Sequence, residues 1–238
     1  MPFRSAHVSR VLAGTFHYST VLTDWQIGTV IDMLETTTIV DSAKQFIVGD
    51  ETSTATLSGH IDTLGTAGSH LASMNTWKST PTGLTVAPSG FSLGSELVMV
   101  LANEGNITTT SVDNEVSGFS LAAQTDGFTD FGVSLHDLTA ETADLSGTGV
   151  DNAASSANGG TAQLHVSAFS GFTSAVVIVE HSTNNSVWAT LATFATATAT
   201  TSDRVLVAAG ATVNRYLRYS VDVTGTGSVT FQVGFARR

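Results

Sequence analysis

The C-terminal third of the chain alternates between apolar and polar residues with the period of a half-buried strand. Residues 161–168 (TAQLHVSA), 215–223 (RYLRYSVDV) and 229–235 (VTFQVGF) each place their apolar side chains on one face. Residues 175–182 (AVVIVEHS) begin with a continuous apolar run, which is typical of a strand covered on both faces. The GTGS turn signal at 225–228 separates the last two strands. This part is predicted to be an antiparallel β-sandwich, similar to a jelly roll.

The N-terminal part has a less regular pattern, in which strands are again the best match. A strand-like alternation covers residues 54–62. Residues 43–48 (AKQFIV) follow a potential capping Asp or Ser and stop at Gly49, which predicts one or two turns of helix. Residues 30–40 fit either a helix or a strand, and the β-branched run at 36–40 favours a strand. Further strands are predicted near residues 95–104, 115–124 and 130–138, with a short helix as the alternative at 95–104.

Residues 145–161 are small and polar and carry no aromatic side chain, which indicates a boundary. We therefore predict one domain over residues 1–150, a linker over 151–160 and a second domain, the antiparallel β-sandwich, over 161–238. No regular alternation of strands and helices appears, so a doubly wound parallel fold is not expected. The predicted fold class is mainly β, with one short helix.

The charge distribution limits the possible partners. The 238-residue chain has a net charge of −11, although only 12% of its residues are charged. Residues 1–160 carry −13 and residues 161–238 carry +2, and no Lys or Arg lies between Ser79 and Asp203. Tight binding of nucleic acid needs clustered cations, so it is not expected. An acidic surface would instead repel phosphates.

Other classes are limited by what the composition lacks. The chain contains no cysteine, so it forms neither disulfides nor thiolate metal sites. No apolar run approaches the roughly 18–20 residues that cross a bilayer. No secretory signal is visible either, so we expect a soluble protein made in the cytoplasm.

Three motifs in the sequence have residue types that can carry chemistry. The GFSLG sequence at 90–94 has the G-x-S-x-G pattern of a hydrolase nucleophile elbow, but Pro88 precedes it and no long helix follows, so a loop-to-strand turn is favoured. His60 and Asp62 share the polar side of a strand, where a solvated face is favoured over a metal site. The DGFTD sequence at 126–130 favours a hairpin turn over a weak cation site. No catalytic residue, metal or cofactor is therefore predicted.

The aromatic side chains of the C-terminal part allow two interpretations. They could line a sugar-binding face of a jelly roll, or they could fill its core. Most of them fall in phase with the aliphatic residues, which favours the core. These residues are Trp188, Phe194, Tyr216, Tyr219, Phe231 and Phe235.

Residues 30–62 resemble the N-terminal half of the major tail tube proteins of long-tailed (siphovirus-type) bacteriophages. In that family a strand ending in Thr-Thr leads into a short turn and then into a second strand. Residues 179–194 and 215–238 are similar to the β-sandwich ending of such proteins from actinobacterial phages, whereas residues 63–150 carry no matching motif. The matching residues in the first stretch are Thr36, Thr37, Ala43, Lys44, Phe46, Ile47, Gly49, Leu57, Ser58, Gly59 and Asp62.

The resemblance implies a structural role. It implies a tail tube domain, a β-barrel or sandwich, over residues 1–150, with six copies forming a ring and rings stacking into a hollow tube. The implied partners are further copies of the chain, the tape measure protein, and tail terminator or tip proteins. Genomic double-stranded DNA would pass through without specific binding. The protein would be assembled in the host cytoplasm and would reside in the virion tail.

Two sets of residues follow as site candidates. Self-assembly is expected to involve the predicted turn and a loop tryptophan, namely Lys44, Phe46, Ile47 and Trp77. Acids between residues 96 and 151 are expected to include lumen-facing residues, with Glu104, Asp113 and Glu115 as candidates, because a negative lumen repels DNA. The alternative functions are a carbohydrate-binding tail or capsid decoration module and a serine hydrolase that uses Ser92.

Overall fold

The computed structural model describes residues 8–61, 73–78, 80–113 and 115–238. Its regular structure is nearly all antiparallel β-sheet, with 64% strand and 5% helix. This confirms the predicted mainly-β fold class. No helix among the described residues is both long enough and apolar enough to span a membrane.

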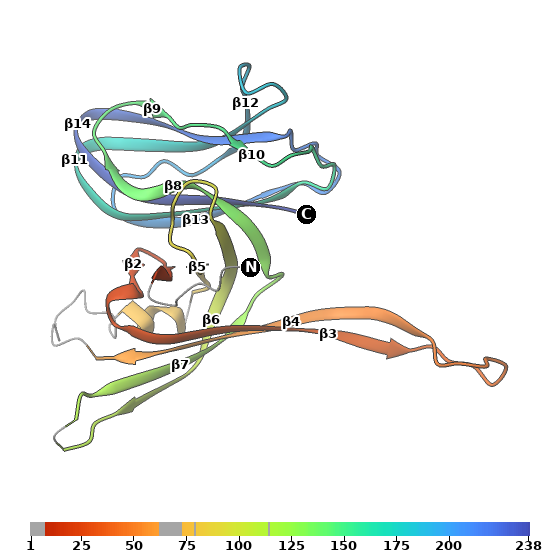
Figure 1. The fold of residues 1–238 in the computed structure, drawn as a ribbon. Coiled ribbons are helices and arrows are strands. Elements are labelled where there is room, and N and C mark those ends of the chain that lie inside the picture. Colours follow the sequence, from red (N-terminus) through yellow and green to blue (C-terminus); the bar gives the residue numbers. More distant parts are fainter. Residues whose placement is uncertain (1–7, 62–72, 79, 114) are drawn as a thin grey trace. The chain divides into compact units, whose positions relative to one another are not determined.

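The chain forms two compact units that are discontinuous in sequence (Figure 1). Unit 1 consists of Met1–Thr20, Thr82–Met99 and Asp130–Arg238, and unit 2 consists of Val21–Pro81 and Val100–Thr129. These divisions differ from the predicted domains over 1–150 and 161–238. The reason is strand pairing, because Val133 in the first predicted domain pairs with Phe235 in the second.

Unit 1 is built on a sheet with the strand order β12-β11-β14-β8-β6-β5-β1-β2. In addition, β13 pairs with β11, and β9 and β10 pair with β14. The bounds are β1 (Arg10–Ala13), β2 (Phe16–His17), β5 (Thr82–Ala87), β6 (Glu96–Thr110, of which the first four residues belong to unit 1), β8 (Asp130–Glu141), β9 (Leu145–Ser146), β10 (Val150–Asp151), β11 (Gly160–Ser182), β12 (Ala189–Thr193), β13 (Thr201–Val207) and β14 (Tyr216–Arg237), with the short 3₁₀ helix η2 at Tyr18–Thr20.

Strands β11 and β14 are each longer than the sequence pattern predicts. The predicted strands at 161–168 and 175–182 are parts of one strand, and the predicted turn at 225–228 lies inside β14. The register shifts between Val166 and Ser174, where Gly225 takes a positive φ opposite Phe172. Bulges of this kind bend a strand without ending it.

The bend allows both halves of each long strand to contribute to one core. Leu164 and Val166 from the first half of β11 join Val177 and Val179 from its second half in a single buried cluster. Phe231 of β14 belongs to the same cluster. The alternation that predicted these strands therefore also identified the side chains that fill the core.

Unit 2 contains the antiparallel strands β3-β4-β7-β6 in that order. Leu57 of β4 pairs with Leu121 of β7, and both side chains are buried. Trp77 is also buried, in the short 3₁₀ helix η3. The bounds are β3 (Leu22–Glu35), β4 (Phe46–His60), η3 (Asn75–Lys78) and β7 (Gly118–Thr125).

The prediction of a helix over residues 43–48 is wrong. The strand favoured over residues 30–40 is present only as far as Glu35, where β3 ends. Residues 36–45 connect β3 to β4, and β4 runs from Phe46 through Gly49, which lies beside Asp32 of β3. One or two isolated turns of helix are unstable in water, whereas pairing with β3 satisfies the backbone. Asp41 accepts hydrogen bonds from the Thr38 amide and hydroxyl, and these lower the pKa of its carboxyl group.

The turn at residues 126–129 is present, but it does not form the predicted hairpin. Gly127 has a φ of +82°, as a tight turn requires. Strands β7 and β8 do not pair with each other; each pairs with a different part of β6. One end of β6 thus pairs with β8 and the other with β7, and the turn at residues 126–129 joins these two neighbours.

Candidate assembly surface

The outer part of the β3–β4 hairpin pairs with no other strand among the described residues. Strand β4 pairs with β7 only from Thr54 to His60, whereas it pairs with β3 out to Phe46. We call residues 30–52 of this hairpin the arm (Figure 1). A two-stranded ribbon is only marginally stable in water without further packing.

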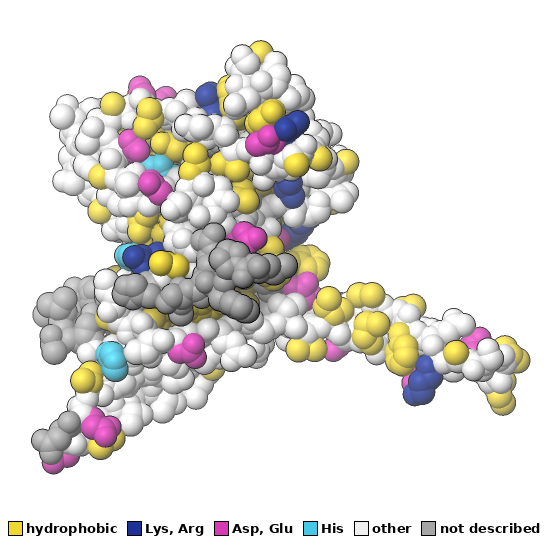
Figure 2. Space-filling view, viewed as in Figure 1, with side chains coloured by type: hydrophobic (Ala, Val, Ile, Leu, Met, Phe, Trp, Pro, Cys, Tyr) yellow, Lys and Arg dark blue, Asp and Glu magenta, His cyan; other side chains and the backbone are white. Residues whose placement is uncertain are grey.

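The arm is rich in exposed apolar side chains (Figure 2). It carries half of the large hydrophobic residues that are exposed in the described part of the chain. A soluble monomer rarely leaves so many together, so such a patch marks an interaction surface. The arm's exposed hydrophobic residues are Val30, Ile31, Met33, Leu34, Ile39, Val40, Phe46, Ile47 and Val48.

The apolar residues lie on both faces of the arm. Met33 pairs with Val48, and the adjacent Leu34 pairs with Ile47. Successive residues of a strand point to opposite faces, so each face receives one of these apolar pairs. A strand segment that is apolar on both sides has the pattern of a strand covered on both sides.

The ion pair of the arm contributes little to the stability of the hairpin. Lys44 Nζ lies 3.0 Å from Glu35 Oε2, but both side chains are well exposed. Ion pairs of this kind contribute little to stability, because water and salt screen them. The arm is thus held mainly by its own backbone pairing, and the residues that the structure describes leave its apolar side chains exposed.

The predicted self-assembly residues fall in two places. Lys44, Phe46 and Ile47 belong to the arm, and the latter two are among its exposed apolar residues. Trp77 is only 1% exposed, so an intact chain does not present it to a partner.

The sequence prediction missed the apolar residues of β3, namely Val30, Ile31, Met33 and Leu34. Two apolar runs flanking a Thr-rich turn were the signal for a hairpin. Residues 30–40 on their own fit either a helix or a strand, so local sequence does not establish the hairpin.

The predicted lumen residues lie in and after β6. Asp113 and Glu115 are exposed in the connection between β6 and β7. Glu104 belongs to β6 itself. Glu104, Asp113 and Glu115 lie outside the arm in sequence, so they form a separate set of candidates.

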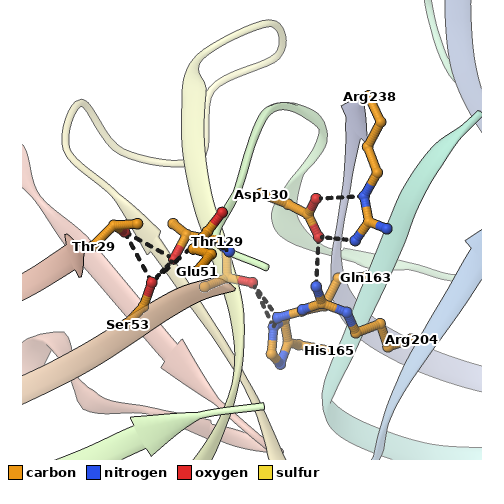
Figure 3. A network of polar contacts seen from close by, with 10 residues as sticks. Thr29, Glu51, Ser53, Thr129, Asp130, Gln163, His165, Arg204 and Arg238 are labelled. Carbon is orange, nitrogen blue, oxygen red and sulfur yellow. Dashed lines mark hydrogen bonds and ion pairs between the residues drawn. The ribbon is translucent and has the colours of Figure 1, made fainter. Parts of the chain in front are cut away.

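A buried polar network in unit 1 has a structural role. Asp130, which is 4% exposed, accepts hydrogen bonds from the guanidinium groups of both Arg204 and Arg238 (Figure 3). Arg204 also donates to Gln163 Oε1. These groups satisfy one another, as buried charges must.

His165 is part of the same region of unit 1 and is fully buried. Its Nδ1 donates to the Gly14 carbonyl oxygen at 2.7 Å, and its Nε2 lies 2.7 Å from Thr85 Oγ1. Burial lowers the pKa of His165 to about 4, so the ring is neutral at physiological pH.

The fold gives little support to the alternative of a sugar-binding aromatic face. Phe194, Tyr219, Phe231 and Phe235 are buried, as predicted for core residues. Trp188 and Tyr216 are half-buried, but the guanidinium of Arg218 lies 4.3 Å from the Trp188 ring and that of Arg215 lies 5.0 Å from the Tyr216 ring. Each arginine occupies a ring face on which a sugar would stack.

The other predicted motifs also lack supporting geometry. Ser92 is exposed in a turn that leads into β6, so the long helix of a nucleophile elbow does not follow it. His60 is exposed at the end of β4, and Asp62 lies outside the described residues. No group of three or more metal-binding side chains occurs in the part of the chain that the structure describes.

No protein-family model and no curated protein matches the chain. Among solved structures, a chain in the virion of a native gene transfer agent particle is 12% identical, with a TM-score of 0.45 over 54% of this chain and 98% of that one. The Dit protein of phage SPP1 is 9% identical, with a TM-score of 0.38 over 96% and 98%. A chain of the phage p2 baseplate is 8% identical, with a TM-score of 0.38 over 97% and 98%. TM-scores below 0.5 do not assign a function, so the arm itself carries the proposal.

Proposed function

We propose that the chain is a structural protein of a phage tail, which assembles into stacked, hexameric rings that form the tail tube. The observation that carries this proposal is the arm, which has apolar residues on both faces and no covering strand in the described part of the chain. Copies of one chain can cover such a ribbon when a heterologous contact closes into a ring and rings stack. The resemblance to major tail tube proteins supports the same conclusion, because residues 30–62 include the whole arm.

The net charge agrees with a tube that conducts DNA. Residues 1–160 carry −13, and Asp113 and Glu115 are exposed. We infer that they and Glu104 face the lumen, where negative charge would repel the phosphates of passing double-stranded DNA. During assembly the lumen would hold the tape measure protein, and terminator or tip proteins would close the ends.

Electron microscopy of the purified, full-length protein over a range of concentrations tests the proposal. We expect rings, or tubes with a central channel, to appear as the concentration rises. Sedimentation velocity on the same samples should show a loss of monomer over the same range. A chain that stays monomeric at high concentration and across ionic strengths would overturn the proposal.

A further inference from the structure

Three hydroxyl groups form a closed ring at the base of the arm (Figure 3). Thr29 Oγ1 donates to Thr129 Oγ1 at 3.2 Å, Thr129 Oγ1 donates to Ser53 Oγ at 2.8 Å, and Ser53 Oγ donates to Thr29 Oγ1 at 3.0 Å. Each hydroxyl has one proton, so each donates once and accepts once around the ring. Ser53 and Thr129 are buried, which makes the loss of a partner costly.

The ring lies at the point where β4 loses its second neighbour. The pairing of β4 with β7 ends at Thr54 and Gln124. Immediately beyond it, Thr125 Oγ1 donates to the Ser53 carbonyl oxygen at 3.1 Å. The Thr129 amide donates to Glu51 Oε1 at 2.8 Å. Side chains and one amide of residues 125–129 thus take the place of a neighbouring strand along residues 51–53.

We propose that this set of contacts, which we call the arm bracket, is a positioning device for assembly. It comprises Thr29, Glu51, Ser53, Thr125 and Thr129. The bracket holds the base of a ribbon whose outer part pairs with no further strand among the described residues, so it fixes where the free arm begins and the direction in which it leaves unit 2. The bracket's role in assembly rests on the proposed function, whereas its effect on the arm of a single chain does not.

A pair of variants at one position separates the hydroxyl from the bulk of the side chain. Thr129→Val keeps the shape but removes the donor and acceptor, whereas Thr129→Ser keeps the hydroxyl. Ser53→Ala removes a second member of the ring. Its matched control is Thr52→Ala, which removes an exposed hydroxyl from the adjacent position of β4.

Hydrogen exchange of the full-length monomer measures how firmly the bracket holds the arm. We expect the amides of residues 46–53 to exchange about tenfold faster in Thr129→Val and Ser53→Ala, since one lost buried hydrogen bond has about this effect on a local opening equilibrium. Thr129→Ser and Thr52→Ala should exchange like the unmodified chain. Unchanged exchange in both Thr129→Val and Ser53→Ala would overturn the proposal.

Assembly is then measured on the same four variants by sedimentation. We expect Thr129→Val and Ser53→Ala to need several-fold higher concentrations to assemble, with thermal unfolding of unit 1 unchanged. Faster exchange without any change in assembly would overturn the positioning role while leaving the local contacts established. If the unmodified chain itself does not assemble, the proposed function fails, and the exchange result still decides whether the bracket holds the arm.

Discussion

Replacing Leu34 and Ile47 together with threonine gives the sharpest test of the arm as an assembly surface. The two residues are 54% and 53% exposed and form a cross-strand pair. Threonine is β-branched and favours strands, so the ribbon itself should persist. The change removes apolar surface at a place where nothing in the described chain covers it.

The size of the effect follows from the exposed area. Full burial of a Leu or Ile side chain is worth about 1.5–3 kcal/mol, so covering the exposed half of each is worth about 0.8–1.5 kcal/mol. The double variant should therefore lose about 1.5–3 kcal/mol for each contact that covers the pair. This corresponds to association that is about 10- to 100-fold weaker.

Sedimentation velocity and electron microscopy against protein concentration provide the assay. The matched control replaces Val187 and Leu206, which are 74% and 64% exposed outside the arm, with threonine. Neither variant should change the free energy of unfolding of the single chain by more than about 0.5 kcal/mol, because the replaced side chains are on the surface. If the arm variant assembles like the control, the arm is not the assembly surface.

Three further predictions concern charge. The folded pKa of His165 is about 4, so the unfolded chain binds more protons below about pH 6.5, and the free energy of unfolding should fall by about 3 kcal/mol between pH 6.5 and 4. In denaturant titrations, His165→Gln should lack this component of the pH dependence. An identical pH dependence in the two proteins would contradict the assignment. Asp130→Ala leaves two guanidinium groups without their shared carboxylate and should cost about 3–5 kcal/mol of unfolding free energy; a loss below about 1 kcal/mol would show that the network behaves like a surface ion pair. Tubes assembled from the Asp113→Asn, Glu115→Gln variant should retain more short double-stranded DNA at low salt than unmodified tubes, as measured with fluorescently labelled DNA; equal retention would place these acids outside the lumen.

Sequence periodicity predicted strands well where one face is buried by the chain itself. The alternation in residues 229–235 and the strand predicted at 130–138 correspond to parts of β14 and β8. The pattern did not show that residues 161–168 and 175–182 form one strand. A bulge and a hairpin turn both call for glycine or small polar residues, so local sequence cannot separate them.

The arm was harder to predict because its side chains do not pack within the chain. The apolar cluster at residues 43–48 lacks the alternation of a half-buried strand, and a capping residue and Gly49 suggested a helix. Pairing with β3 decides the outcome, because residues 46–48 pair with residues 33–35. The bracket was equally hidden, because Thr29, Ser53 and Thr129 are distant in sequence and common in a Thr-rich chain.

The pairing of β8 with β14 has a consequence for how the protein is made. Val133 pairs with Phe235, so the edge of β8 stays open on the ribosome until the residues of β14 have been synthesised. Such distant pairings also make folding slow, because a long loop must close before the contact forms. A fragment that stops near residue 150 would keep that edge open permanently, exposing unpaired backbone groups that promote aggregation.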